Sequence, residues 1–262
     1  MATLGPATAQ ITIQVGSDAI LNNAFTAPSP YANMNNGSRN QLLFHADELI
    51  AAGMGPGTIS GYGFNVFAES GTTLIGFAGY IGTTTATDLT NQWETGLVPA
   101  WAAADFTDVA GWTNHPFDTP FLWDGVSNIV IEMCYTNPNT TQNAQVFQSA
   151  TAFTSCVSRN SPNPTICNSP TGTHVLWQQR PNTRFQWQSL DVPPVAQISA
   201  SPAFTCTGTV NFSDESQYTP TSWEWSFGDD STSTEQNPTH VYTISGTFTV
   251  QLIATNQFGT DT

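Results

Sequence analysis

The sequence predicts an all-β protein, in which a jelly-roll-like β-sandwich is followed by a smaller immunoglobulin-like β-sandwich. Three observations support this fold class. Thr, Val, Ile and aromatic residues recur in short runs between Gly, Pro and Asn, as in strands joined by turns. Charged residues make up only 9% of the 262 residues, which include 20 glycines and 17 prolines. A single segment, residues 46–54, has a helical pattern, with Asp47 or its neighbour as N-cap and Gly53 as the stop.

The first block, residues 10–188, contains apolar residues that alternate with polar ones. These are Ile11, Ile13 and Val15, then Tyr62, Phe64 and Val66, and then Ile129, Ile131, Met133 and Tyr135. A period of two places one face of each strand in a core. Roughly eight to ten such strands, separated by turn signals, predict a β-sandwich or jelly roll.

A polar, proline-containing stretch at residues 188–194 precedes the second block, and we expect an exposed joint there. The second block, residues 193–262, has four strand-like runs: VAQISAS, GTVNFSD, SWEWSFG and GTFTVQLIATN. Two of them carry apolar faces, formed by Trp223, Trp225 and Phe227 and by Phe248, Val250, Leu252 and Ala254. Two such faces packed together predict a small immunoglobulin-like sandwich with a buried tryptophan on a middle strand.

The charge balance excludes some function classes. Four cationic residues, all arginines, stand against 19 acidic ones, so that the formal net charge is -15. Such a chain has too few cations to displace the counterions of DNA or RNA, and we expect no nucleic-acid partner. No run of about eighteen apolar residues occurs, so we also expect no membrane insertion.

Several features favour an extracellular or cell-surface location. Ala7-Thr8-Ala9 fits the end of a secretory signal, so residues 1–9 are either the remnant of one, which is the interpretation we favour, or a chance match. The four cysteines agree with an oxidising setting. The loop CVSRNSPNPTIC predicts a Cys156–Cys167 disulfide, with Cys134–Cys167 as the alternative. We expect no bridge within the second block, where Cys206 is alone.

The segment WEWSFGDDSTSTEQNPTHVYTISGTFTVQLIATNQFG resembles the polycystic-kidney-disease (PKD) domain. The hallmark of that family is a W-x-F-G-D-G strand and turn, followed by N-P-x-H-x-Y and G-x-Y-x-V. The resemblance covers most of residues 193–262 and implies an immunoglobulin-like module. Asp230 replaces the second glycine of the hallmark, and aspartate tolerates the left-handed conformation of such a turn. A hairpin turn offers no cleft that would shift carboxyl pKa values, so we interpret Asp229 and Asp230 as non-catalytic.

The first block resembles a β-sandwich module that recurs in large proteins exported by the type IX secretion system, often beside PKD or fibronectin-type repeats. RNQLLFHADELIAAGMGPGTISGYGFNV, FDTPFLWDGVSNIVIEMCY and RPNTRFQW carry this resemblance. It implies a cell-surface or released multidomain protein, and no activity of the module itself. It also implies O-glycosylation at Asp230-Ser231-Thr232, with Ser231 as the acceptor.

Motifs for catalysis are missing from the sequence. It contains no G-x-S-x-G, H-E-x-x-H or paired C-x-x-C motif, and its four histidines are scattered without the spacing of metal ligands. We therefore predict no catalytic residue, no firm metal site and no cofactor other than calcium. The turn residues Asp124, Asn128, Asp229 and Asp230 are weak calcium candidates, although Asp and Asn also favour turns by bonding the local backbone.

Tryptophans supply the remaining candidate site. Trp93 and Trp101 are expected to be exposed, where their rings could stack on a sugar, whereas Trp123 is expected in the core. The opposing interpretation is that tryptophans fill the space between two sheets.

We predict a non-catalytic secreted or cell-surface modular protein that acts in adhesion or presents other domains of its polypeptide. One alternative is a carbohydrate- or protein-binding accessory region of a larger secreted hydrolase. Another is a self-associating filament subunit, since sandwich edges can pair between chains. The expected partners are extracellular glycans or protein surfaces and further domains of the same polypeptide. Because the chain ends at Thr262, we also expect the second sandwich to lack its last edge strand.

Overall fold

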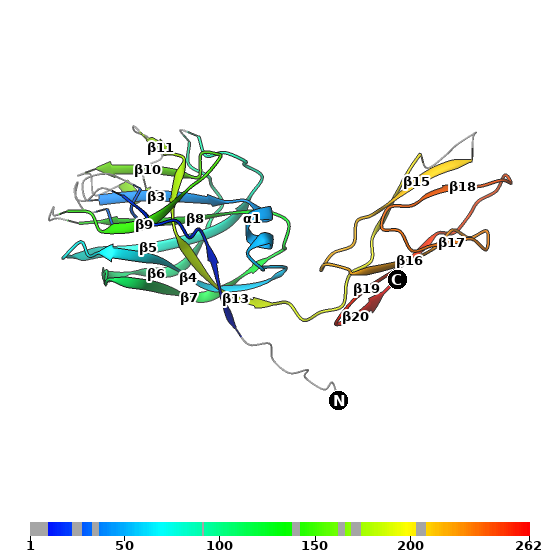
Figure 1. Cartoon of the computed structure of the whole chain (residues 1–262), viewed down its shortest axis with the longest axis horizontal. Coiled ribbons are helices and arrows are strands. Elements are labelled where there is room, and N and C mark those ends of the chain that lie inside the picture. The colour runs from blue at the N-terminus through cyan, green and yellow to red at the C-terminus, as the bar shows by residue number, and fades with distance from the viewer. Residues whose placement is uncertain are drawn as a thin grey trace, which may run out of the picture. The chain divides into compact units, whose positions relative to one another are not determined.

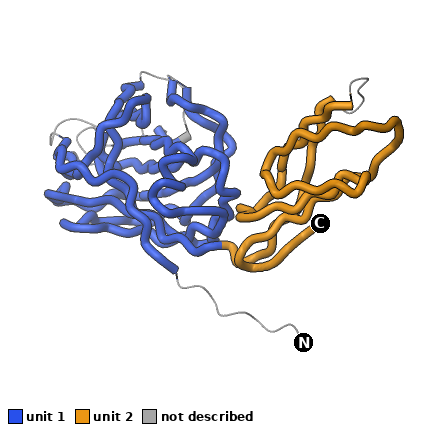
Figure 2. Tube along the Cα trace, turned by 45° about the vertical axis from the view of Figure 1, so that its right-hand side comes forward, with its two compact units in different colours: residues 1–189 blue, residues 190–262 orange. Residues whose placement is uncertain are grey.

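The computed structural model describes residues 10–22, 28–32, 37–90, 92–137, 142–161, 166–168, 174–202 and 208–262. The chain forms two compact units, Met1–Ser189 and Leu190–Thr262, which Figure 2 colours separately. The predicted secretory segment 1–9 and Cys206 lie outside the described residues. Among the residues that are described, no helix is long and apolar enough to cross a membrane.

The first unit is a sandwich of two antiparallel sheets (Figure 1). The seven-stranded sheet has the order β1-β13-β4-β9-β12, with β7 also paired to β4 and β2 to β9. Its strands are β1 (Ile11–Val15), β2 (Ile20–Leu21), β4 (Gly57–Ala68), β7 (Gly111–Trp123), β9 (Gln145–Ala150), β12 (Gln179–Pro181) and β13 (Thr183–Ser189). The six-stranded sheet has the order β11-β10-β3-β8-β5-β6. Its strands are β3 (Gly37–Phe44), β5 (Thr73–Thr84), β6 (Val98–Thr107), β8 (Asn128–Thr136), β10 (Cys156–Ser161) and β11 (Val175–Trp177). The described part of this unit thus has more strands than predicted.

The alternating patterns of the sequence define the core between the two sheets. Tyr62, Phe64 and Val66 of β4 face this core, as do Ile13 and Val15 of β1. The four predicted apolar residues of β8 are fully buried in the same cluster. The all-β class and the inward faces of these strands are therefore confirmed. Ile11 departs from the pattern, because it lies at the start of β1 and is 44% exposed.

The one α-helix of the described residues, α1 (Ala46–Ala51), is shorter than predicted, and its N-cap is His45 rather than Asp47. The Glu48 side chain accepts a hydrogen bond from the His45 backbone N–H at 2.9 Å, which satisfies an otherwise free donor at the helix start. Gly53 has a φ of 101° and donates its N–H to the Ile50 carbonyl, so it ends the helix as predicted.

The disulfide joins Cys134 to Cys167, so the prediction of Cys156–Cys167 is wrong. The reason is the length of β10, which begins at Cys156 and carries the chain away from it over six residues, to Ser161. A strand of that length spans about 17–20 Å, whereas a disulfide needs Cα atoms about 5.5–6 Å apart. Cys134 lies opposite Arg39, which lies opposite Arg159 near the far end of β10. Cys156 stays a free thiol buried in the core.

We expect the Cys134→Ser/Cys167→Ser double variant to lose about 3–4 kcal/mol of unfolding free energy, because the bridge closes a loop of 33 residues in the unfolded chain. Denaturant unfolding followed by tryptophan fluorescence measures the loss. Cys156→Ala is the matched control, since it removes a thiol and leaves the bridge in place. Equal midpoints for the double variant and the oxidised protein would contradict the assignment.

The second unit has two small sheets around a core of its own. One has the order β14-β15-β18 and the other β17-β16-β19-β20. The strands are β14 (Ile198–Ser201), β15 (Thr209–Asp214), β16 (Ser222–Ser226), β17 (Thr232–Ser233), β18 (Thr239–Val241), β19 (Gln251–Asn256) and β20 (Gly259–Asp261). The core comprises Val210, Phe212, Trp225, Phe227, Leu252 and Ala254, which confirms the buried tryptophan and the immunoglobulin-like arrangement.

The last strand, β20, was expected to be missing from the second unit. It pairs with β19 over three residues, from Asn256↔Gly259 to Ala254↔Asp261. A two-residue turn at 257–258 joins the two strands, so the chain reverses earlier than the sequence pattern suggested. The expectation that this edge has no ladder partner at all is therefore wrong.

Candidate functional site

Trp93, a predicted sugar platform, is buried instead of exposed. Trp93 is only 7% exposed. Its side chain packs with Leu43, Leu89, Val130 and Val157 on the outer face of the six-stranded sheet. The Arg39 guanidinium lies 4.3 Å from the centre of its ring. The sequence did not predict this burial, because Trp93 lies outside the regular strands and alternation gives no face to such a residue. The segment that carries Trp93 packs on the sheet.

Trp101 is half-buried and is also covered by neighbours. Its ring is stacked on His115, with centroids 4.9 Å apart, and on Phe77 at 5.7 Å. Its indole N–H donates to the Phe77 carbonyl at 3.2 Å. Any side chain in place of Gly79 would collide with this ring. The prediction that Trp93 and Trp101 are the exposed rings is therefore wrong, whereas Trp123 is fully buried as expected.

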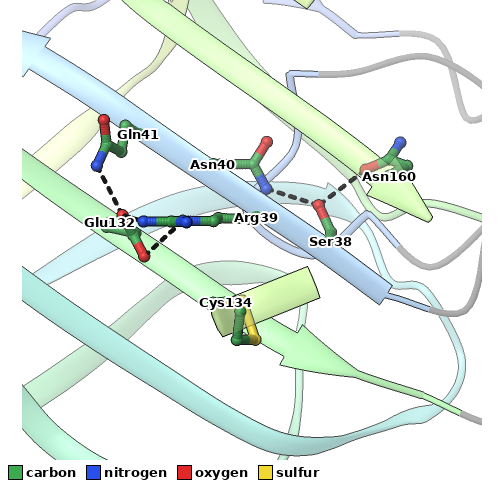
Figure 3. The surroundings of a disulfide bond; sticks show 8 residues. Ser38, Arg39, Asn40, Gln41, Glu132, Cys134 and Asn160 are labelled. Carbon is green, nitrogen blue, oxygen red and sulfur yellow. Dashed lines mark hydrogen bonds and ion pairs between the residues drawn. A yellow bond between two sulfur atoms is a disulfide. The ribbon is translucent and has the colours of Figure 1, made fainter. Parts of the chain in front are cut away.

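A buried carboxylate, that of Glu132, forms an ion pair with Arg39 that no sequence pattern indicates. Glu132 of β8 accepts hydrogen bonds from Arg39 at 2.9 and 3.0 Å and from Gln41 at 2.6 Å (Figure 3). Burial raises the pKa of Glu132, and Arg39 opposes that rise. Gln41 also exchanges two hydrogen bonds of 2.8 Å with the Glu94 backbone. These hydrogen bonds hold the segment that carries Trp93 against the sheet. The Glu132 carboxylate is buried and is not accessible to a substrate.

The first pair of calcium candidates, Asp124 and Asn128, serves the local backbone and α1. Asp124 accepts hydrogen bonds from the N–H groups of Val126 and Ser127 and from the Ser127 hydroxyl, at 2.6–3.0 Å. Partial burial alone would raise the pKa of Asp124, but these donors lower it. Asn128 accepts from the Ala46 N–H at 2.8 Å and donates to the Ala86 carbonyl. Their oxygen atoms are thus already engaged, and calcium binding there stays a prediction.

The second pair, Asp229 and Asp230, lies in the turn after β16. Asp230 has a φ of 69°, which confirms the left-handed position where the hallmark has glycine. Asp229 accepts hydrogen bonds from the Ser231 hydroxyl and N–H and lies 2.8 Å from the His240 Nε2. The hydrogen bond from Ser231, aided by that of His240, lowers the pKa of Asp229. Within the described ranges, no three His, Cys, Asp or Glu side chains come together in a way that could hold a metal.

The cluster of Asp229, Ser231 and His240 has the residue types of a serine-hydrolase triad, but not its geometry. In a triad the serine and the aspartate contact opposite ring nitrogens, so that the histidine relays a proton between them. Here the His240 Nε2 is 2.8 Å from Asp229 and 3.3 Å from the Ser231 Oγ, so one nitrogen meets both. Phe227 lies flat against the ring at 4.3 Å and 4°. The cluster stabilises the turn and does not activate a nucleophile.

His115 is a buried histidine of β7 in the first unit, with 5% exposure. Its Nε2 lies 2.7 Å from the Tyr31 hydroxyl, and Trp101, Phe77 and Phe106 surround the imidazole. Burial lowers the pKa of His115 from its ordinary value of 6.5 to about 3. The ring is therefore neutral at physiological pH and is a structural member of the core.

We expect the stability of the first unit to depend on pH through His115. The unfolded chain takes up a proton near pH 6.5 while the folded protein does not. The stability that the neutral His115 ring gives the folded state is thus fully present above pH 6.5 and is lost as the pH falls toward 3. Between pH 7 and 5 the loss is about 2 kcal/mol. Urea unfolding of the protein and of His115→Gln at both pH values measures it. An identical pH slope in the two proteins would contradict the prediction.

Comparison with known proteins agrees with the fold of the second unit. Residues 191–262 match the PKD domain family. The PKD domain therefore accounts for β14–β20 and for the Asp229–Asp230 turn. A stretch of 38 residues is 55% identical to collagenase ColA of Bacillus cereus. It covers 14% of this chain and only 4% of that protein, so the similarity concerns a small part of the collagenase. The type IX resemblance of residues 10–188 stays a prediction.

Proposed function

We propose that this chain is a non-catalytic, extracellular modular region that anchors or spaces other parts of its polypeptide. The PKD domain, separated from a larger sandwich at Ser189–Leu190, is the observation that carries the proposal. The Cys134–Cys167 disulfide supports an oxidising compartment. Adhesion through a glycan or protein surface is the expected use of such a region. Export by the type IX system, O-glycosylation at Ser231 and self-association remain predictions.

A second candidate is an accessory region of a secreted hydrolase. The similarity to a short stretch of a protein named collagenase favours it, because a collagenase is a hydrolase. In that case the present chain would hold the enzyme on its substrate, and the chemistry would belong to another part of the polypeptide. Sedimentation with insoluble collagen and with insoluble polysaccharides distinguishes the two substrate classes.

The purified chain is expected to show no turnover of polysaccharides, esters or peptides above the rate without protein. The reason is that the Asp229, Ser231 and His240 side chains meet through one ring nitrogen and lack a relay. A chromogenic ester panel and a collagen-peptide assay measure turnover. If a trace of activity appears, the matched control is His240→Ala, which tests whether this cluster is responsible for it. Turnover that this variant, or any single Asp or Glu substitution, abolishes would overturn the non-catalytic assignment.

A further inference from the structure

The outer face of the seven-stranded sheet is the starting point. Gln14 of β1 lies opposite Arg184 of β13, Arg184 opposite Gly63 of β4, and Gly63 opposite Asn114 of β7. Their sequence neighbours, including Ile13, Val15, Phe64 and Phe185, are buried between the sheets. Because successive strand residues point to opposite faces, this row lies on the outside of the sandwich.

Four amides, one indole and one guanidinium form this surface, which we call the amide face: Gln14, Asn65, Trp112, Asn114, Arg184 and Gln186. All six side chains belong to residues that are exposed or half-exposed. The Arg184 guanidinium lies 3.8 Å from the centre of the Trp112 ring, and its Nε donates to the Gln14 Oε1 at 3.3 Å. The aromatic ring, the cation and the amide are thus connected across four strands.

Two glycines of β4 shape the amide face. A Cβ at Gly63 would collide with the Asn114 side chain, and one at Gly61 would collide with that of Gln186. Both amides therefore lie along the sheet over a backbone without side chains. The Gln186 Oε1 is buried and accepts no hydrogen bond. A buried acceptor without a donor is costly. Because Gln186 as a residue is half-exposed, its amide could turn outward, and a ligand hydroxyl would then supply the missing donor.

The charge of the amide face decides the class of ligand. β1, β4 and β13 contain no acidic residue, in a chain with 19 of them, and the Asp118 carboxylate of β7 accepts from the Ala102 N–H. A cationic ligand finds no counter-charge on this face. A polyanion is repelled by the net charge of -15. A neutral ligand meets neither penalty.

We propose that the amide face binds a neutral polysaccharide chain. Each amide offers a donor and an acceptor at a fixed spacing, which suits neighbouring sugar hydroxyls, and the Trp112 ring offers an apolar surface to a sugar face. The sugar contact thus moves from Trp93, which is buried, and Trp101, which packs against the core, to the half-exposed Trp112. Arg184 lies over one face of the Trp112 ring, so the opposite face would meet the sugar. This inference rests on the proposed function as an anchoring module and names its ligand class.

Affinity electrophoresis in native gels tests the proposal, with a neutral glucan, galactomannan, xylan or soluble chitin derivative cast in each gel. We expect at least one of them to retard the chain, with little effect of salt because no ion pair is involved. Polygalacturonate and gelatin are expected not to retard it. Asn114→Ala and Gln186→Ala each should weaken the retardation at least about tenfold. Trp112→Ala should abolish it.

Gln251→Ala is the matched control, because Gln251 is an exposed amide on a strand of the PKD domain. It should bind like the unchanged protein, and thermal melting should show that the amide variants stay folded. Absence of retardation by every neutral polysaccharide would overturn the proposal, as would full retardation of the Asn114→Ala/Gln186→Ala variant. Retardation by gelatin that these substitutions abolish would assign the face to a protein partner instead. None of these outcomes bears on turnover, so the non-catalytic assignment is tested separately.

Discussion

Replacing Arg180 by alanine is expected to lower the unfolding free energy of the first unit by about 3–5 kcal/mol. Arg180 is 3% exposed and forms a bidentate ion pair with Glu48 of α1. Its two terminal guanidinium nitrogens donate to the two carboxylate oxygens at 2.9 and 3.2 Å. The same guanidinium donates to the Leu43 carbonyl and lies 3.9 Å from the centre of the Phe44 ring. Removing it takes the donor from the buried Leu43 carbonyl and the charged partner from the Glu48 carboxylate, which keeps its hydrogen bond from the His45 N–H.

Arg184→Ala is the control for this variant, since Arg184 is also an arginine of the seven-stranded sheet but lies on its outer face. It should cost less than about 1 kcal/mol, as exposed charges do. Arg180→Met combined with Glu48→Leu should recover much of the loss, because removing both charges leaves no buried charge unpaired. Chemical denaturation measures all three variants. A loss below about 1 kcal/mol for Arg180→Ala would contradict the structural role given to this pair.

The Trp225→Ala variant is expected to unfold the PKD domain selectively. Trp225 is 1% exposed in the small core, and its indole N–H donates to the Glu235 carbonyl at 2.9 Å. Truncating a buried tryptophan costs about 3–5 kcal/mol, which is comparable to the whole stability of a domain of this size. The melting temperature of the PKD domain should fall by more than about 12 °C in this variant.

Differential scanning calorimetry resolves whether the two units melt separately. Trp223→Ala is the control, because Trp223 is only half-buried on the same strand and its N–H reaches the Asp214 carboxylate. We expect a smaller shift for it, and an unchanged transition for the first unit in both variants. If Trp225→Ala lowers both transitions together, the two units do not unfold independently.

The sequence by itself determined the features that depend on neighbours along the chain. Alternation over two residues placed Tyr62 and Phe64 toward the core, since a strand turns successive side chains to opposite faces. The left-handed conformations at Gly53 and Asp230 followed from the residue types that tolerate them. The PKD domain was predictable for the same reason, because its hallmark is local.

Only the tertiary structure decided which distant residues meet. The bridge of Cys167 to Cys134 depends on the register of β10, β3 and β8, and the local loop suggested Cys156 instead. The burial of Trp93 depends on a connecting segment that folds over a sheet.

The amide face combines residues that are far apart in the sequence, and Gln14 and Arg184, for example, are 170 positions apart. Strand order in an antiparallel sheet is set by the packing of the whole core, and side chains on the outward face leave no pattern that identifies their neighbours on other strands. The local alternation of the sequence therefore determined the inward and outward faces of the strands, while the order of the strands determined which outward side chains form a surface.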